Sequence, residues 1–342
     1  MKKIKRGFIL PSAAFTIKER QVKYYESSGK APVAGDVVYG TISRIGQHSS
    51  LENVSGRIHK IHNGSKAIFV FGNRYAPDYY EAVIPKRWPE DEIDLIARSG
   101  VIGSVKTKNS LIKDPTRVKL LGYVCQEDGT VLNTRSLPLI APQKTTKKTP
   151  RAKMILVCGT SMNSGKSMAA VACCWALATM GHTVRASKVT GTASLKDILH
   201  MNDAGANPYA DFTYLGYPST YLLEETELLG IFNQLDLKYA NNPKNFWVVE
   251  FADGIIQRET AMLLSSPDVT SRIHKFIFCA SDPFGAIGGL RILEERFQIK
   301  PDALSGVCSS SPLHLRELSE FTDIPVFNSG NPDLKLLANV LI

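Results

Sequence analysis

Several common signatures are missing from this chain of 342 residues. No apolar run approaches the roughly 20 residues that cross a bilayer. The basic N-terminus leads into an apolar stretch that is too short for a secretory signal. The six cysteines form no Cys-x-x-Cys pair, and several lie in apolar runs, which is typical of free thiols buried in a reducing compartment. We therefore expect a cytoplasmic protein that has no contact with membranes.

Several catalytic motifs are absent as well. The seven histidines show neither His-Glu-x-x-His nor His-x-x-x-His spacing, so the sequence predicts no zinc site. Gly-x-Ser-x-Gly, the motif of a serine nucleophile on a sharp turn, does not occur. Residues 285–289 read GAIGG, which does not match the Gly-x-Gly-x-x-Gly dinucleotide fingerprint.

Charge is unevenly distributed along the chain. Residues 1–153 contain 27 Lys and Arg against 13 Asp and Glu, a net +14, and residues 154–342 contain 14 against 19, a net −5, which together give +9. This asymmetry indicates two domains with different surfaces. A basic half can bind a polyanion such as nucleic acid. Alternatively, the positive charge provides solubility or docks against the acidic half.

The two halves also differ in their hydrophobic patterns. Residues 142–153, PQKTTKKTPRAK, are polar and basic and are predicted to be a linker. Before them, short runs such as GDVVYGTISRI and KAIFVFG predict a β-rich domain over residues 1–141, with a barrel- or sandwich-like form. After them, apolar strands such as MILVCG and KFIFCAS alternate with amphipathic helices. Residues 154–342 are therefore predicted to form an α/β domain with a doubly wound parallel sheet.

The decisive motif of the second half joins a predicted strand to a predicted helix. Gly159 ends the apolar run MILVCG, and Gly165-Lys166-Ser167 opens the helix after five intervening residues. This is the phosphate-loop pattern Gly-x-x-x-x-Gly-Lys-Ser/Thr with one extra residue. Backbone N–H groups and the helix N-terminus would bind phosphates, Lys166 would reach the β and γ phosphates, and Ser167 would bind Mg²⁺. The predicted residues for ATP, or another nucleoside triphosphate, are Gly159, Thr160, Ser161, Met162, Asn163, Ser164, Gly165, Lys166, Ser167 and Met168.

The start of this loop, Gly159-Thr160, and its five-residue spacing resemble dethiobiotin synthetase, a relative of the cobyrinic-acid amide synthases. The resemblance extends over residues 154 to about 330. It implies a P-loop NTPase fold, ATP with Mg²⁺, a small-molecule substrate and a homodimer. Ser161 and Asn163 replace acidic residues that are common in the synthetase loop. The related partitioning ATPases carry a second lysine at the position of Ser161, which makes their kind of dimer a poorer match.

Two strand ends supply the predicted chemistry beside the loop. Glu250 follows the apolar residues 246–249, and the resemblance assigns a metal-binding glutamate to this position. Lys188 ends another predicted strand, where the synthetase has a lysine that serves the reacting groups. Because ligands of open α/β sheets bind at the carboxyl ends of strands, Lys166, Lys188 and Glu250 are predicted to be catalytic. Ser167, Glu250 and Asp203 are the predicted Mg²⁺ ligands.

Further residues are candidates for substrate binding, and each also has an ordinary structural interpretation as a packed loop or an exposed side chain. They are Thr190, Gly191, Thr192, Asp253, Arg258, Tyr217 and Ser219. The favoured function is an ATP-dependent ligase or synthetase that activates a carboxylate or a similar small-molecule nucleophile. The alternatives are a nucleotide-switched NTPase that regulates assembly on nucleic acid or a protein partner, and a small-molecule kinase.

Overall fold

The computed structural model describes residues 1–142 and 150–342, which form two compact units. The first consists of residues 1–141, 191–196 and 212–222, and the second of residues 142–190, 197–211 and 223–342. Two short segments of the second half thus belong to the β-rich unit, although the sequence pattern indicated a single boundary. The predicted linker at 142–153 lies largely outside the described residues. Among the described residues, no helix combines the length and hydrophobicity needed to cross a membrane.

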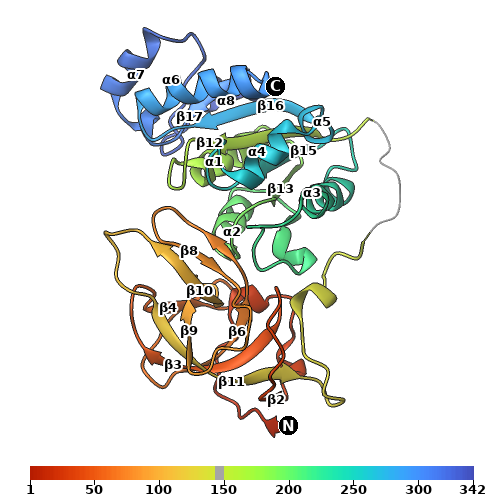
Figure 1. Cartoon of the computed structure of the whole chain (residues 1–342). Coiled ribbons are helices and arrows are strands. Elements are labelled where there is room, and N and C mark those ends of the chain that lie inside the picture. The colour runs from red at the N-terminus through yellow and green to blue at the C-terminus, as the bar shows by residue number, and fades with distance from the viewer. Residues whose placement is uncertain (143–149) are drawn as a thin grey trace. The chain divides into compact units, whose positions relative to one another are not determined.

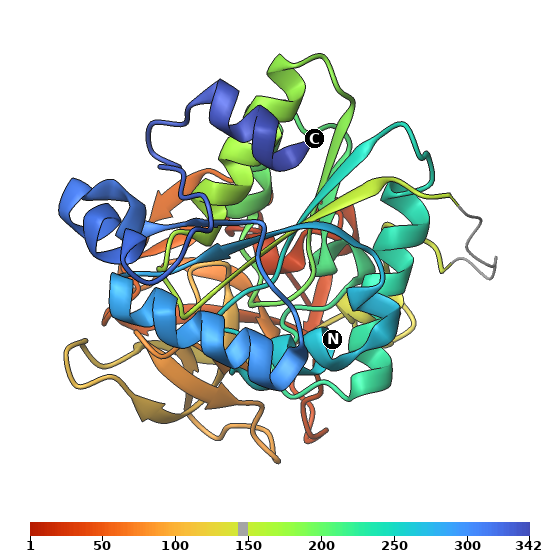
Figure 2. The same ribbon diagram turned by 90° about the horizontal axis from the view of Figure 1, so that it is seen from above.

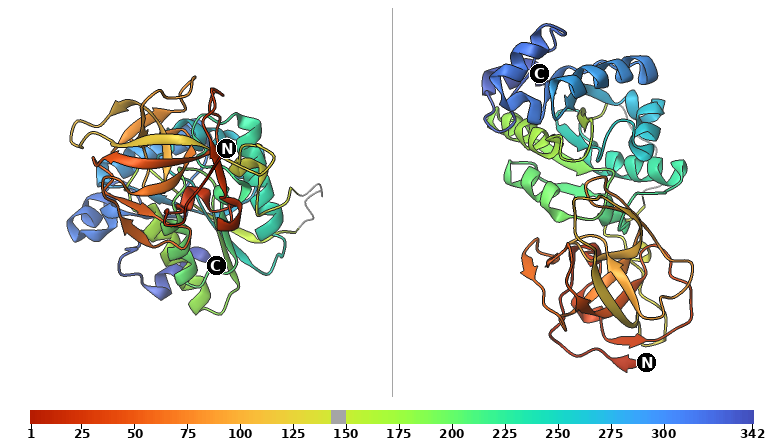
Figure 3. Two further views of the ribbon diagram at one scale, coloured as in Figure 1. Left: turned by 90° about the horizontal axis from the view of Figure 1, so that it is seen from below. Right: turned by 60° about the vertical axis from the view of Figure 1, so that its left-hand side comes forward.

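The first unit is built from short strands (Figure 1). They are β1 (Lys2–Lys3), β2 (Tyr24–Glu26), β3 (Val37–Arg44), β4 (Ser50–Glu52), β5 (Ile58–Lys60), β6 (Lys66–Phe71), β7 (Arg74–Tyr75), β8 (Tyr80–Val83), β9 (Glu92–Leu95), β10 (Val101–Lys108) and β11 (Thr116–Cys125). The main sheet has the order β1-β2-β11-β3-β6-β10-β8-β7, and β9 pairs with both β10 and β11. This double pairing closes a ring, β11-β3-β6-β10-β9, which is a small barrel. Figure 3 shows these strands from two further sides.

Alternation along the strands explains the two faces of the ring. In β6, Ala67, Phe69 and Phe71 pack in one hydrophobic cluster, whereas Ile68 and Val70 pack in another. Successive side chains of a strand point to opposite faces, so an apolar run such as KAIFVF is buried on both sides. The first cluster has members on all five strands of the ring, and the second includes N-terminal residues and Ala193.

The second unit has a parallel sheet with helices on both faces, which confirms the predicted α/β fold. Its strands are β12 (Lys153–Gly159), β13 (Val184–Lys188), β14 (Tyr209–Asp211), β15 (Phe246–Glu250), β16 (Ile273–Cys279) and β17 (Ala303–Ser305). Their order is β14-β13-β15-β12-β16-β17, with parallel pairing. The helices are α1 (Lys166–Thr179), α2 (Leu195–Asp203), α3 (Glu225–Tyr239), α4 (Arg258–Ser265), α5 (Pro267–Thr270), α6 (Pro283–Ile292), α7 (Pro312–Ser319) and α8 (Leu334–Leu341). Figure 2 shows α1 and α8 on one face of the sheet and α6 on the other.

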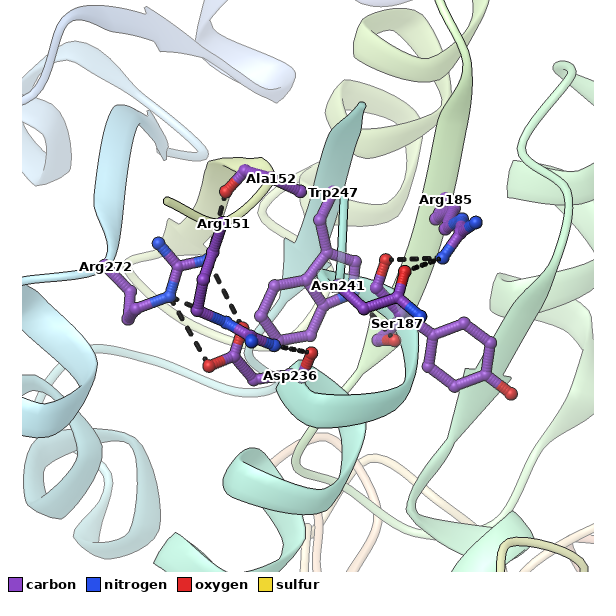
Figure 4. A network of polar contacts seen from close by, with 9 residues as sticks. Arg151, Ala152, Arg185, Ser187, Asp236, Asn241, Trp247 and Arg272 are labelled. Atoms are coloured by element: carbon purple, nitrogen blue, oxygen red, sulfur yellow. Dashed lines mark hydrogen bonds and ion pairs between the residues drawn. The ribbon is translucent and has the colours of Figure 1, made fainter. Parts of the chain in front are cut away.

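A buried polar network ties α3 to the amino ends of the strands (Figure 4). Asp236 on α3 is fully buried and accepts hydrogen bonds from Arg151 Nε at 3.2 Å and Arg272 Nη2 at 3.2 Å. Arg185 donates to the carbonyl oxygen of Tyr239 at 3.1 Å. Because a buried carboxylate is tolerated when cations and hydrogen bonds surround it, this network fixes α3 against the strands. The opposite, carboxyl edge of the sheet carries the phosphate loop.

Candidate functional site

The loop between β12 and α1 is held in place by glycine contacts. Gly165 precedes α1 with a φ of 97°, and a Cβ atom there would lie 2.6 Å from Cα of Gly306. At Gly159, a Cβ atom would lie 2.8 Å from the carbonyl oxygen of Cys279. That same oxygen accepts the backbone N–H of Thr160 at 2.9 Å. Both glycines of the motif are therefore required by close backbone approaches, which pack the loop against the chain that follows β16 and β17.

Lys166 is the first residue of α1 and is 6% exposed. Its Nζ donates to the carbonyl oxygen of Ser161 at 2.6 Å, so the side chain lies across the loop. Burial lowers the pKa of this ammonium group, and the charge of Glu250 offsets part of the effect. A cation at the N-terminus of a helix, beside the loop that precedes it, is suited to bind phosphate oxygens.

The structure brings the two main predicted magnesium ligands together. Glu250 ends β15, which pairs with β12 in the sheet. Ser167 Oγ donates to Oε1 of Glu250 at 3.3 Å. The other oxygen, Oε2, is buried and has no hydrogen-bond partner among the residues that the structure describes. Since a buried carboxylate oxygen without a partner is unfavourable, a cation at this position would satisfy it.

These residues fit Mg²⁺ that is shared with a nucleotide better than a metal held by the protein alone. Within residues 1–142 and 150–342, no group of three or more His, Cys, Asp and Glu side chains is placed to hold a metal. Mg²⁺ in phosphate-transfer sites typically takes one or two protein oxygens, and phosphates and water complete its shell. Ser167 and Glu250 would be those oxygens.

Lys188 also lies beside Glu250. Its Nζ forms ion pairs with Oε1 of Glu250 at 3.1 Å and with Asp197. Burial lowers the pKa of the Lys188 ammonium, but the two carboxylates outweigh this effect and raise it above its ordinary value. The two ion pairs therefore favour the charged form of Lys188, which ends β13 at the carboxyl edge of the sheet.

Asp197 is the site residue that the sequence did not single out. It lies in the first turn of α2. Residues 194–197 read Ser-Leu-Lys-Asp, which matches the capping-box pattern and so indicates a structural role. Asp203, the predicted second metal ligand, is the last residue of the same helix and is exposed. The rise per residue of an α-helix separates the two by about 9 Å along the axis. Asp203 was predicted as a metal ligand, and the acid of this helix that contacts Lys188 is Asp197.

Several substrate candidates take part in the packing of the first unit. Gly191 N donates to Thr220 Oγ1 at 2.9 Å, and Thr192 forms a β-bridge with Ser219. The ring of Tyr217 lies 4.5 Å from the guanidinium of Arg135. These contacts give each residue a structural role within residues 191–196 and 212–222.

The remaining candidates lie in the second unit. Thr190 is buried, and its Oγ1 accepts the N–H of Ala252 at 2.7 Å, so it joins the ends of two strands. Arg258 donates to the carbonyl oxygen of Leu223 at 2.8 Å and to Glu259 at 2.6 Å. Asp253 has a φ of 59° and lies close enough to Lys166 to raise its pKa. Asp253 is accordingly the one of these three whose charge acts at the loop.

Most of the residues predicted to contact the nucleotide are at least partly open to solvent. Met162 is partly exposed, Asn163 is exposed with a φ of 60°, and Met168 in the first turn of α1 is 46% exposed. These side chains are therefore accessible from solvent.

Comparison with known proteins identifies no family for this chain. Neither the scan of family models nor the search of curated proteins found a match. Among solved structures, the signal recognition particle receptor FtsY from Elizabethkingia anophelis in complex with GDP is 10% identical, with 61% of this chain and 69% of that chain covered and a TM-score of 0.37. The ParA family ATPase from Chlorobium tepidum TLS is 13% identical, with 52% and 82% covered and a TM-score of 0.35. The parallel sheet and the phosphate loop themselves therefore define the class, which is an α/β protein with a P-loop.

Proposed function

We propose that the second unit binds a nucleoside triphosphate with Mg²⁺ at residues 159–168 and breaks the bond to its γ phosphate. The observation that carries this proposal is the pairing of Ser167 with Glu250, 3.3 Å apart, next to a buried lysine that lies across the loop. Mg²⁺ at this position would screen the charge of the phosphates. The backbone of the loop and Lys166 would orient them, since phosphoryl transfer depends mainly on positioning and charge stabilisation.

The favoured acceptor is a small molecule with a carboxylate. Lys188 is a buried cation beside Glu250 and could hold such an anion against the γ phosphate. The bond from the γ phosphorus to its bridging oxygen would break, and a bond to the carboxylate oxygen would form. The nucleoside diphosphate would leave, and the acyl group would then pass from the acyl phosphate to a second acceptor, with release of inorganic phosphate. This corresponds to a ligase or synthetase, and direct release of the phosphorylated product would correspond to a kinase.

The basic first half supports the alternative, a nucleotide switch acting on nucleic acid. The two functions differ in what stimulates turnover. A synthetase or kinase needs a small acceptor, whereas a switch hydrolyses its nucleotide alone or with a polyanion.

The test measures binding of fluorescent ATP and GTP analogues, and phosphate release, for the wild type and Lys166→Ala. Removal of one charge-stabilising group at a reacting centre typically lowers turnover about 100-fold or more. Lys244→Ala, which removes an exposed lysine in the residues before β15, is the matched control and should behave like the wild type. Binding without release in the wild type favours a missing acceptor. Release that is lost in Lys166→Ala favours the switch. Equal nucleotide binding by the wild type and Lys166→Ala would contradict the proposal.

A further inference from the structure

Asp197 and Glu250 share one ammonium group. Lys188 Nζ pairs with Asp197 Oδ2 and lies 3.1 Å from Glu250 Oε1. The side chains of Lys188, Asp197 and Glu250 are 11%, 22% and 1% exposed. The cation therefore lies between a partly accessible carboxylate and a fully buried one.

The carboxylate oxygen that contacts Lys188 is also the one that Ser167 uses. Ser167 Oγ donates to Oε1 of Glu250 at 3.3 Å. Without a neighbouring cation, a carboxylate as buried as Glu250 would be strongly unfavourable. In the protein without a metal, Lys188 neutralises the side chain that the proposed function assigns to Mg²⁺.

Lys188 and a metal ion at Ser167 and Glu250 would repel each other, because like charges at close range in a buried site interact strongly. We propose that Asp197 is a positioning residue, which retains Lys188 at the site when the metal takes over Glu250. This inference rests on the proposed binding of Mg²⁺ and nucleotide. Asp197 gives the ammonium an alternative partner, so that Lys188 releases Glu250 and keeps its charge beside the transferred group.

Removal of the Asp197 charge leaves Glu250 as the carboxylate that pairs with Lys188. The ammonium then competes with Mg²⁺ for Glu250. An opposite charge close to an ionic group typically changes its equilibria by one to three powers of ten, and the low end applies to a partly accessible pair. Asp197→Asn should therefore raise the Mg²⁺ concentration for half-maximal nucleotide binding about tenfold.

The effect of Asp197 should operate through Lys188. Lys188→Met removes the competing cation and should lower the Mg²⁺ requirement below that of the wild type. When Asp197→Asn is combined with Lys188→Met, it should change the Mg²⁺ requirement little further, because the two substitutions act on one shared interaction. This non-additivity separates positioning from a general loss of structure.

The experiment titrates Mg²⁺ against a fixed concentration of whichever fluorescent nucleotide, ATP or GTP analogue, the wild type binds. The readout is equilibrium binding and requires no turnover. Glu225→Gln is the matched control, since Glu225 is an exposed acid in the first turn of α3, as Asp197 is an acid in the first turn of α2. Its Mg²⁺ requirement should equal that of the wild type. Circular dichroism establishes that each variant is folded, and Lys188→Met still tests the inference if Asp197→Asn does not fold.

Each result bears on the inference separately from the proposed function. An unchanged Mg²⁺ requirement in Asp197→Asn, or an equal loss of nucleotide binding with and without Mg²⁺, would overturn the role of Asp197. So would a tenfold effect that persists in the double variant. If the wild type bound no nucleotide, or bound it without any effect of Lys166→Ala, the proposed function would fall and the inference with it.

Discussion

The geometry of the phosphate loop predicts that substitution by alanine has different effects at the two glycines that flank α1. Gly165 and Gly181 both have positive φ, 97° and 84°. A Cβ atom on Gly165 would lie 2.6 Å from Gly306 Cα and 3.1 Å from Val307 N, whereas a Cβ atom on Gly181 would meet nothing within 4 Å. Alanine at either position costs about 1–3 kcal/mol of backbone strain. At Gly165 the collision adds to this, and since both partners are backbone atoms, the loop itself must move.

Gly181→Ala should therefore lower the free energy of unfolding by about 1 kcal/mol and leave nucleotide affinity unchanged. Gly165→Ala should lower stability further and weaken nucleotide binding about tenfold or more, which corresponds to about 1.4 kcal/mol. Urea unfolding and equilibrium binding of the fluorescent nucleotide measure the two quantities on the same samples. The reasoning is refuted if Gly165→Ala binds as tightly as the wild type, or if Gly181→Ala loses binding to the same extent.

Two further predictions concern stability. Asp236→Asn leaves Arg151 and Arg272 without this buried counter-charge and should lower the free energy of unfolding, measured in urea, by about 3–5 kcal/mol. The control Asp268→Asn, at an exposed site, should have little effect. Similar losses of stability in both variants would contradict the importance of the network. Burial of His48, with the nearby charge of Arg74, lowers its pKa from 6.5 to about 4. Between these two pH values, the His48 side chain is neutral in the folded protein and protonated in the unfolded chain. The difference in pKa corresponds to about 3 kcal/mol of the free energy of unfolding. This stability is fully present above pH 6.5 and is lost as the pH falls from 6.5 through 4. His48→Gln should flatten the pH dependence of unfolding over this range, and an unchanged slope would refute the role of burial.

The features that the sequence predicted well are local ones. The phosphate loop lies within ten residues, and it can be recognised from the apolar run of the preceding strand and from its glycine and lysine residues. Glu250 could be found because an apolar run ends at it, and parallel strands deliver their carboxyl ends to one edge. The α/β class followed from the alternation of apolar strands and amphipathic helices, and the structure confirms it.

The features that the sequence did not reveal depend on contacts between distant segments. The pairing of β9 with both neighbours closes the ring, and no residue in Glu92–Leu95 signals a second partner. Asp197 and Asp203 are both acids on one helix, and only the folded path of the chain decides which of them meets Lys188. Tyr217 was a candidate for substrate binding, and its contact with Arg135, 82 residues earlier in the chain, could not be read from the sequence.

The composition of the first unit sets an order for its assembly during synthesis. Ala193 belongs to its core, and Thr134 Oγ1 donates to the carbonyl oxygen of Gly216 at 2.7 Å. A ribosome that has released only residues 1–141 has not yet supplied these parts. The β-rich unit is therefore complete only after residue 222 has emerged, by which time the phosphate loop and β13 are already outside. A fragment that ends at residue 141 lacks Ala193 and the acceptor of Thr134, so a separate production of the complete unit would have to include both later segments.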